Sequence, residues 1–173
     1  EIASQIAVDR LAGIGPVSSI DDLVRGVQEA NADILERARE QPEFRGMGTT
    51  VVMFADIERA GSHRLGVANV GDSRLYRLTD SGLHQHTEDH SLVEALVRDG
   101  RLTRAEAAVH PQRNIVTRAL GIDDKVLVDA WELIPVAGDR YVLCSDGLFG
   151  EIDDGEIHDC LLYTSDAADE GHC

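Results

Sequence analysis

Long hydrophobic runs are absent from this sequence of 173 residues, and cysteine is scarce. No apolar stretch approaches the roughly 20 residues that a membrane-spanning helix requires, so no membrane segment is expected. The three cysteines form neither a disulfide framework nor a zinc-ligand pattern. Cys144 lies in an apolar run typical of a buried strand, where cysteine behaves as a small hydrophobic residue. This use of cysteine indicates a reducing, cytoplasmic location.

Basic residues are also scarce, because 16 lysines and arginines stand against 32 aspartates and glutamates, which gives a net charge of −16. This balance argues against nucleic acid as a partner, since phosphate backbones are held by clustered basic side chains. It is compatible with a site for divalent cations, which prefer carboxylate oxygen, although most acidic side chains only solvate a surface. None of the seven histidines has metal-ligand spacing, which favours an all-oxygen site.

The two ends of the chain have unusual sequences. The chain begins with Glu1 rather than methionine and carries no signal-peptide pattern, so we expect that its true N-terminus is missing. Residues 160–170 resemble the translation of a transposase adapter that is used in DNA sequencing libraries. The alternative is a native helix cap with a polar tail, but the apolar periodicity stops abruptly here. We therefore interpret residues 160–173 as a sequencing artefact and expect the native sequence to end near Asp159.

Apolar spacing predicts two long helices near the start of the chain and two short ones further on. The long helices cover residues 1–12 and 20–41, and Pro42 ends the second one. Ser91 and Thr103 each open a short helix as the first residue of a capping box, with a glutamate three residues later. The first two helices are expected to pack on one sheet face.

The strands are predicted from β-branched and alternating apolar residues, with turns at residues 71–74 and 79–82. The predicted strands are residues 49–54, 64–70, 75–78, 126–133 and 140–144. This order describes a meander of antiparallel hairpins. It disfavours a doubly wound parallel sheet, which needs alternating strands and helices.

Three short segments carry residues that suit chemistry as well as structure. Residues 46–50 read Gly-Met-Gly-Thr-Thr before a strand, where glycines usually allow a close backbone approach. Residues 70–74 read Val-Gly-Asp-Ser-Arg at an expected hairpin tip, where Asp72 could simply form the turn. Residues 143–148 read Leu-Cys-Ser-Asp-Gly-Leu, so Asp146 follows an apolar strand. A carboxylate there is held by rigid backbone and suits a metal ligand, although it could also cap the following turn.

The order and spacing of these segments are more specific than any one of them. Before the last segment, His-Pro-Gln-Arg-Asn at residues 110–114 runs into Thr-Arg-Ala-Leu-Gly at 117–121. Together the segments resemble bacterial members of the protein phosphatase 2C, or PPM, family, from Glu1 to about Asp159. The resemblance implies an α+β fold, a four-layer αββα sandwich of two antiparallel sheets flanked by helices, incomplete in this fragment. Residues 1–159 would then form one partial phosphatase domain.

The resemblance also implies a metal site made of oxygen ligands. Asp146 matches the family aspartate that binds the second of two catalytic ions, and Asp72 matches the aspartate that helps to hold a third, weaker ion. Residues 90–114 match the mobile flap beside the active site, and within it Asn114 lies where a flap residue approaches the third ion. The implied ions are Mn²⁺ or Mg²⁺, which take carboxylates and water in octahedral shells.

The implied activity is hydrolysis of phosphoserine and phosphothreonine in proteins by water that the metal ions activate. No catalytic side chain is assigned within the chain, because the family's phosphate-binding arginine and its Asp-Gly-Met-Gly-Gly motif are expected upstream of Glu1. A Gly-Pro-Asp-Asn motif with a further metal ligand is expected beyond Asp159. With only Asp146 left of the binuclear ligands, the fragment itself is predicted to be inactive. Arg74 and His110 match no firm catalytic assignment and are expected to be structural.

Three functional interpretations stay open. The leading one is a phosphatase that opposes bacterial Ser/Thr kinases, with phosphorylated proteins as partners, and the flap segment favours this type. The second is a stress-response phosphatase that acts on an anti-sigma-factor antagonist. The third is a pseudophosphatase, a binding module that has lost its metals, which the presence of both Asp72 and Asp146 disfavours.

Overall fold

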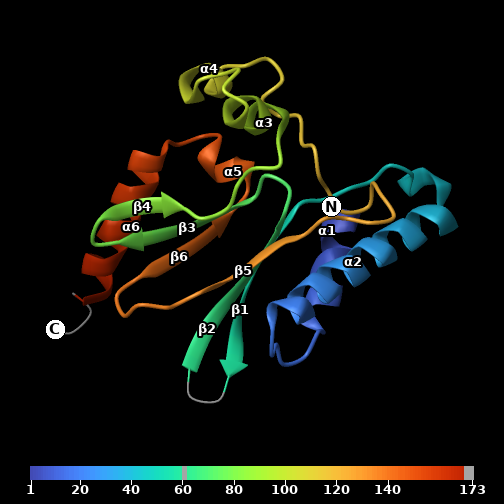
Figure 1. Ribbon diagram of the computed structural model, residues 1–173, viewed down its shortest axis with the longest axis horizontal. Helices are drawn as coiled ribbons and strands as arrows, with labels where there is room; N and C mark the ends of the chain where they lie inside the picture. Colours follow the sequence, from blue (N-terminus) through green and yellow to red (C-terminus); the bar gives the residue numbers. More distant parts are fainter. Residues whose placement is uncertain (60–61, 170–173) are drawn as a thin grey trace.

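The computed structural model describes residues 1–59 and 62–169, which form two β-sheets with helices beside them (Figure 1). The longer helices are α1 (Ile2–Ala12), α2 (Ile20–Glu40) and α6 (Asp154–Asp169). The short ones are η1 (Pro42–Phe44), α3 (Leu92–Arg98), α4 (Arg104–Ala108) and α5 (Asp146–Phe149). The strands are β1 (Val51–Arg59), β2 (Ser62–Val70), β3 (Arg74–Thr79), β4 (Gly82–Gln85), β5 (Asp129–Leu133) and β6 (Arg140–Cys144).

Each sheet has three antiparallel strands, in the order β1-β2-β5 in the first and β4-β3-β6 in the second. The two sheets are in contact where the ring of Phe54 on β1 lies 4.9 Å from the ring of Tyr141 on β6. Helices α1 and α2 flank the first sheet, and α6 lies beside the second (Figure 1). The predicted α+β class, with two antiparallel sheets flanked by helices, is therefore confirmed.

The main core lies between α2 and the first sheet. One stripe of α2 is fully buried, and its members are Leu23, Val27, Ala30 and Ile34. Because they are spaced three or four residues apart, they point to one side of the helix, where they cluster with Ile57 and Val70 of the sheet. Helix α1 joins this core through the small residues Ala3 and Ala7 and lies against α2. Both predicted long helices are confirmed.

One predicted hairpin is wrong. The turn at residues 71–74 does not join two paired strands, because β2 belongs to the first sheet and β3 to the second. The chain crosses between the sheets at Gly71, whose φ is +109°. Glycine and aspartate signal a change of chain direction in either case, so the local sequence cannot tell a hairpin from a crossover. The hairpin is formed by the next turn, at residues 79–82, between β3 and the unpredicted strand β4.

The strand that ends at Cys144 is less buried than predicted. Cys144 is half-buried and Leu143 is 41% exposed. The reason is that β6 is the outer strand of its sheet in the part of the chain that the structure describes. Two strands also begin later than predicted, β1 at Val51 and β5 at Asp129.

Helix α6 continues through residues 160–169, which belong to the segment interpreted as a sequencing artefact. Residues 170–173 of that segment lie outside the described residues. The last helix is attached to the second sheet, since Arg140 of β6 donates a hydrogen bond to the carbonyl oxygen of Leu161 at 2.5 Å. The origin of the segment stays a prediction. Among the described residues, no helix is both long and apolar enough to cross a membrane.

Candidate metal site

Asp72 and Asp146 come from distant parts of the sequence, and the pairing of β3 with β6 brings them together. In this antiparallel pair, Arg74 lies opposite Cys144. Asp72 precedes Arg74 by two residues and Asp146 follows Cys144 by two, so both leave the sheet at the same end. Asp146 is the first residue of α5, and the N-cap position belongs to Ser145. The alternative role of Asp146 as an N-cap is therefore wrong.

The two carboxylates influence each other electrostatically. Asp72 is half-buried, and the loss of hydration raises its pKa above the ordinary value of an aspartate. The charges of Asp146 and Asp89 raise this pKa further, whereas Arg74 lowers it. A divalent cation would relieve the repulsion between the carboxylates, and carboxylate oxygen is its preferred ligand. The pair therefore fits part of an oxygen site for Mn²⁺ or Mg²⁺.

The third predicted ligand, Asn114, is not joined to this pair. Asn114 is exposed in the turn after α4, and no hydrogen bond among the described residues links it to Asp72 or Asp146. His110, earlier in the same turn, accepts a hydrogen bond from the backbone N–H of Gln112 at 3.2 Å. Across residues 1–59 and 62–169, no group of three or more His, Cys, Asp or Glu side chains is arranged to hold a metal ion.

The turn that carries Asp72 is held from two sides. A side chain at Gly71 would collide with Thr50, so only glycine fits at this point between the sheets. The hydroxyl oxygen of Thr50 lies 2.9 Å from that of Ser73, which ties the turn to the start of β1. On the other side, the backbone N–H of Gly71 donates to Nδ1 of His90 at 2.9 Å, and the backbone N–H of His90 donates to the carbonyl of Gly71 at 3.0 Å.

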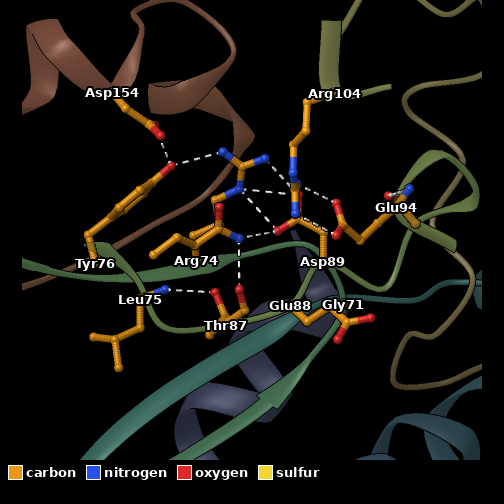
Figure 2. A network of polar contacts seen from close by, with 12 residues as sticks. Gly71, Arg74, Leu75, Tyr76, Thr87, Glu88, Asp89, Glu94, Arg104 and Asp154 are labelled. Atoms are coloured by element: carbon orange, nitrogen blue, oxygen red, sulfur yellow. Dashed lines mark hydrogen bonds and ion pairs between the residues drawn. The ribbon is translucent and has the colours of Figure 1, made fainter. Parts of the chain in front are cut away.

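Arg74, two residues after Asp72 in the sequence, organises a polar network (Figure 2). Its Nε and Nη2 donate to the carboxylate of Asp89 at 3.0 and 2.7 Å, and its Nη1 donates to the hydroxyl of Tyr76 at 2.8 Å. The Tyr76 hydroxyl donates in turn to Asp154 of α6 at 2.9 Å. The guanidinium also lies 3.7 Å from the ring centre of Phe149 on α5. These contacts hold β3, α5 and α6 together, which supports the structural role expected for Arg74.

Residues 90–114 contain the two short helices α3 and α4, which lie outside both sheets (Figure 1). Ser91 caps α3 by accepting a hydrogen bond from the backbone N–H of Glu94 at 3.2 Å, and Thr103 caps α4 in a complete capping box. Arg104 reaches back to the carboxylate of Glu94 with hydrogen bonds of 2.8 and 3.0 Å. Ser91 and Thr103 are both confirmed as capping residues, but the full capping box predicted at Ser91 is wrong. The carboxylate of Glu94 pairs with Arg104 instead, and this ion pair joins the two helices.

The sequence interpretation missed the residues that support Asp72 from the flap side. His90 was expected only as the first residue of the flap, and Asp89 and Asp129 had no expected role. Their position gave some signal, because Asp89 and His90 directly precede Ser91, the predicted cap of α3. Their partners could not be predicted, since Gly71 and Asp129 lie far away in the sequence.

Comparison with known proteins identifies the family. No protein-family model matches the chain. The serine/threonine phosphatase stp of Listeria welshimeri is 40% identical over 139 residues, which cover 80% of this chain and 54% of that protein. Protein phosphatase PhpP of Streptococcus pneumoniae is 38% identical over 172 residues, which cover 95% of this chain and 67% of that protein. The chain belongs to the bacterial PPM-type serine/threonine phosphatases.

A solved structure supports the same family assignment. The catalytic domain of the serine/threonine protein phosphatase PstP, in complex with two manganese ions, matches the chain with a TM-score of 0.77 and 36% identity. The match covers 93% of this chain and 67% of that structure. The chain thus shares the PPM phosphatase fold, but it spans only about half the length of the stp relatives, 54% for the Listeria welshimeri protein.

Proposed function

We propose that the protein to which this chain belongs is a metal-dependent phosphatase that hydrolyses phosphoserine and phosphothreonine in other proteins. The observation that carries the proposal is the register of β3 and β6, since Asp72 and Asp146 both leave the second sheet at the same end and the charge of Asp146 raises the pKa of Asp72. The names of the relatives, serine/threonine phosphatase and protein phosphatase, support the same activity.

Within the chain, we propose Asp146 and Asp72 as ligands of Mn²⁺ or Mg²⁺, with Asn114 of the flap as a further ligand of a third ion. Asp146 is fixed by the end of β6 and the start of α5, and Asp72 by the turn at residues 71–74. When bound, such ions lower the pKa of a coordinated water and neutralise charge on the phosphoryl oxygens. The chain's own residues supply and orient the oxygen ligands of these ions. No side chain in the chain is proposed to attack the phosphate.

We further propose that the 173-residue chain does not hydrolyse phosphoesters by itself. Two ions in octahedral shells need more oxygen ligands than the Asp72–Asp146 pair supplies. A longer parent protein would supply them, in accordance with the 54% of the Listeria relative that the chain spans. On this proposal residues 1–159 are the native part of a phosphatase domain, and residues 160–173 come from a sequencing adapter.

Mn²⁺ binding to the protein of the complete reading frame tests the metal assignment without reference to catalysis. We expect Asp146→Asn and Asp72→Asn each to weaken Mn²⁺ binding by about tenfold or more, as measured by the electron paramagnetic resonance of free Mn²⁺. Asp80→Asn is the matched control, because Asp80 is exposed in the turn at the opposite end of β3. Equal Mn²⁺ binding by that protein and by both of its site variants would overturn the assignment.

Activity is tested on the protein of the complete reading frame, after the source DNA has been resequenced across both ends. We expect Asp-Gly-Met-Gly-Gly upstream, Gly-Pro-Asp-Asn downstream, and Mn²⁺-dependent hydrolysis of a phosphoserine peptide. Binding of the peptide without hydrolysis would instead indicate a pseudophosphatase. Dephosphorylation of a Ser/Thr kinase would favour the leading interpretation, and that of an anti-sigma-factor antagonist the stress-response one. A cytoplasmic location stays a prediction.

A further inference from the structure

His90 is a buried side chain that the proposed metal site does not use. It lies at the base of the flap and is only 7% exposed. Both ring nitrogens have partners, since Nδ1 lies 2.9 Å from the backbone nitrogen of Gly71 and Nε2 lies 2.9 Å from a carboxylate oxygen of Asp129. With its own backbone N–H bonded to the carbonyl of Gly71, His90 contacts both polar groups of the residue that precedes Asp72.

The partners of His90 determine which ring nitrogen carries the proton. The backbone N–H of Gly71 can only donate, so Nδ1 must be the unprotonated acceptor. A neutral imidazole then has its proton on Nε2, and this N–H donates to Asp129. Arg118 also lies 3.0 Å from Nε2, but two donors cannot share one hydrogen bond. Its Nη1 donates instead to the other carboxylate oxygen of Asp129 at 2.6 Å.

Asp129 connects His90 to the first sheet. It is the first residue of β5 and lies opposite Asn69 of β2, so its backbone is held by strand pairing. Burial disfavours its charge, but the hydrogen bonds from His90 and Arg118 outweigh burial and lower its pKa. The carboxylate therefore stays ionised at neutral pH and accepts both bonds. A continuous series of contacts thus leads from β5 through the imidazole to Gly71.

We propose that His90 is a positioning residue for Asp72. The Nε2–H tautomer, fixed by Asp129, presents Nδ1 to the N–H of Gly71 and so sets the orientation of the turn that carries the Asp72 carboxylate. This inference rests on the proposed function of Asp72 as a metal ligand. The simpler alternative is that His90 only fills the core, in which case any substitution of similar size would act through stability alone.

Two substitutions of His90 test the roles of the two ring nitrogens separately. In His90→Asn, the amide oxygen takes the place of Nδ1 and still accepts from Gly71, but the side chain no longer reaches Asp129. In His90→Gln, the amide nitrogen takes the place of Nε2 and still donates to Asp129, but the N–H of Gly71 loses its acceptor. His84→Gln is the control, because His84 is exposed on β4.

The first measurement is amide hydrogen exchange at Gly71 in the full 173-residue chain. We expect His90→Gln to speed exchange of this amide at least about tenfold and His90→Asn to preserve most of its protection, since only the glutamine removes the acceptor. The second measurement is the Mn²⁺ affinity of the protein of the complete reading frame. We expect His90→Gln to weaken it by about 10- to 100-fold, as is typical when the support of a metal ligand is removed, with a smaller loss for His90→Asn.

The outcomes distinguish this inference from the proposed function. Unchanged Gly71 exchange in His90→Gln, or equal effects of both variants on exchange and on Mn²⁺ affinity at matched thermal midpoints, would overturn the positioning role. If the protein of the complete reading frame, with its own residues unsubstituted, binds no Mn²⁺, the metal assignment fails. The exchange measurement then still decides whether His90 orients the turn.

Discussion

At the scale of single residues, the end of the second sheet is crowded with polar groups that satisfy one another. The carboxylate of Asp89 accepts hydrogen bonds from two guanidinium nitrogens of Arg74, and the side-chain amide of Gln85 donates to the same carboxylate at 2.8 Å. A buried charge is tolerated only when it is paired and hydrogen-bonded in this way. The carboxylate of Asp72 differs, because burial and the charges of Asp146 and Asp89 raise its pKa. This contrast separates the groups that support the site from those available to bind a cation.

Tyr76 provides a pH-dependent test of this network. Burial raises the pKa of its hydroxyl to about 12, with the hydrogen bond to Asp154 adding to burial and that from Arg74 opposing it. Because the folded protein favours the protonated phenol, this contribution to stability is complete below the unfolded pKa of about 10 and is lost as the pH rises through about 12. We expect tyrosinate absorbance to show a late step that Tyr76→Phe lacks. A step for Tyr76 near pH 10, as in a free tyrosine, would contradict the burial of its hydroxyl.

At the scale of elements, helices are predicted best because their signals are local. The buried stripe of α2 repeats every three or four residues, and Ser19 and Asp22 form a capping box at its start. The short helices of the flap follow from the same chemistry at Ser91 and Thr103. Strands were located less accurately, and β4, with only four residues, gave no recognisable pattern.

The cap of α4 is expected to determine whether this part of the flap is helical. The Thr103 hydroxyl accepts from the backbone N–H of Glu106 at 3.2 Å, and the Glu106 carboxylate accepts from the Thr103 N–H at 2.8 Å. The pKa of Glu106 is lowered by the hydrogen bonds that the backbone N–H and the hydroxyl of Thr103 donate to this carboxylate. We expect Thr103→Ala to cost the helix about 1 kcal/mol and to speed amide exchange within α4.

The matched control for the cap is Thr103→Ser, which keeps the hydroxyl and should keep the exchange rates. The thermal midpoint of the whole chain should change little in either variant, because α4 is exposed and buries none of its residues. Unchanged exchange in Thr103→Ala would mean that the ion pair with Glu94 holds the helix without the cap.

At the scale of the whole molecule, pairing between strands that are distant in the sequence determines both the fold and the position of the candidate site residues. Strand β2 pairs with β5, and β3 pairs with β6. The pairing of β3 with β6 puts Asp72 and Asp146 at the same end of the second sheet. The pairing of β2 with β5 puts Asp129 within hydrogen-bond distance of His90. The candidate site is therefore a property of the assembled sheets rather than of any one motif.

Removal of residues 160–173 tests the interpretation of this segment as non-native. Ile157 is only 3% exposed and remains in a chain that ends at Asp159, whereas the hydrogen bond from Arg140 to Leu161 is lost. We expect a loss of about 1 kcal/mol in the free energy of unfolding, the typical value of one hydrogen bond. Thermal and urea unfolding of the two chains measure it. Failure of the shortened chain to fold would contradict the artefact interpretation, since the segment would then be part of the structure.

The sequence by itself determined helices α1 to α4, the caps at Ser91 and Thr103, the acidic residues available for a metal and, through the order of its motifs, the family. It did so because helical periodicity, caps and turn residues act over a few neighbouring positions. It did not predict α5 or α6. Only the tertiary structure decided that the Gly71 turn crosses between sheets, that Asp72 and Asp146 lie at the same end of the second sheet, and that His90 joins Gly71 to Asp129. Those contacts depend on which strands pair, and pairing is selected by the burial of the whole core rather than by the residues of one segment.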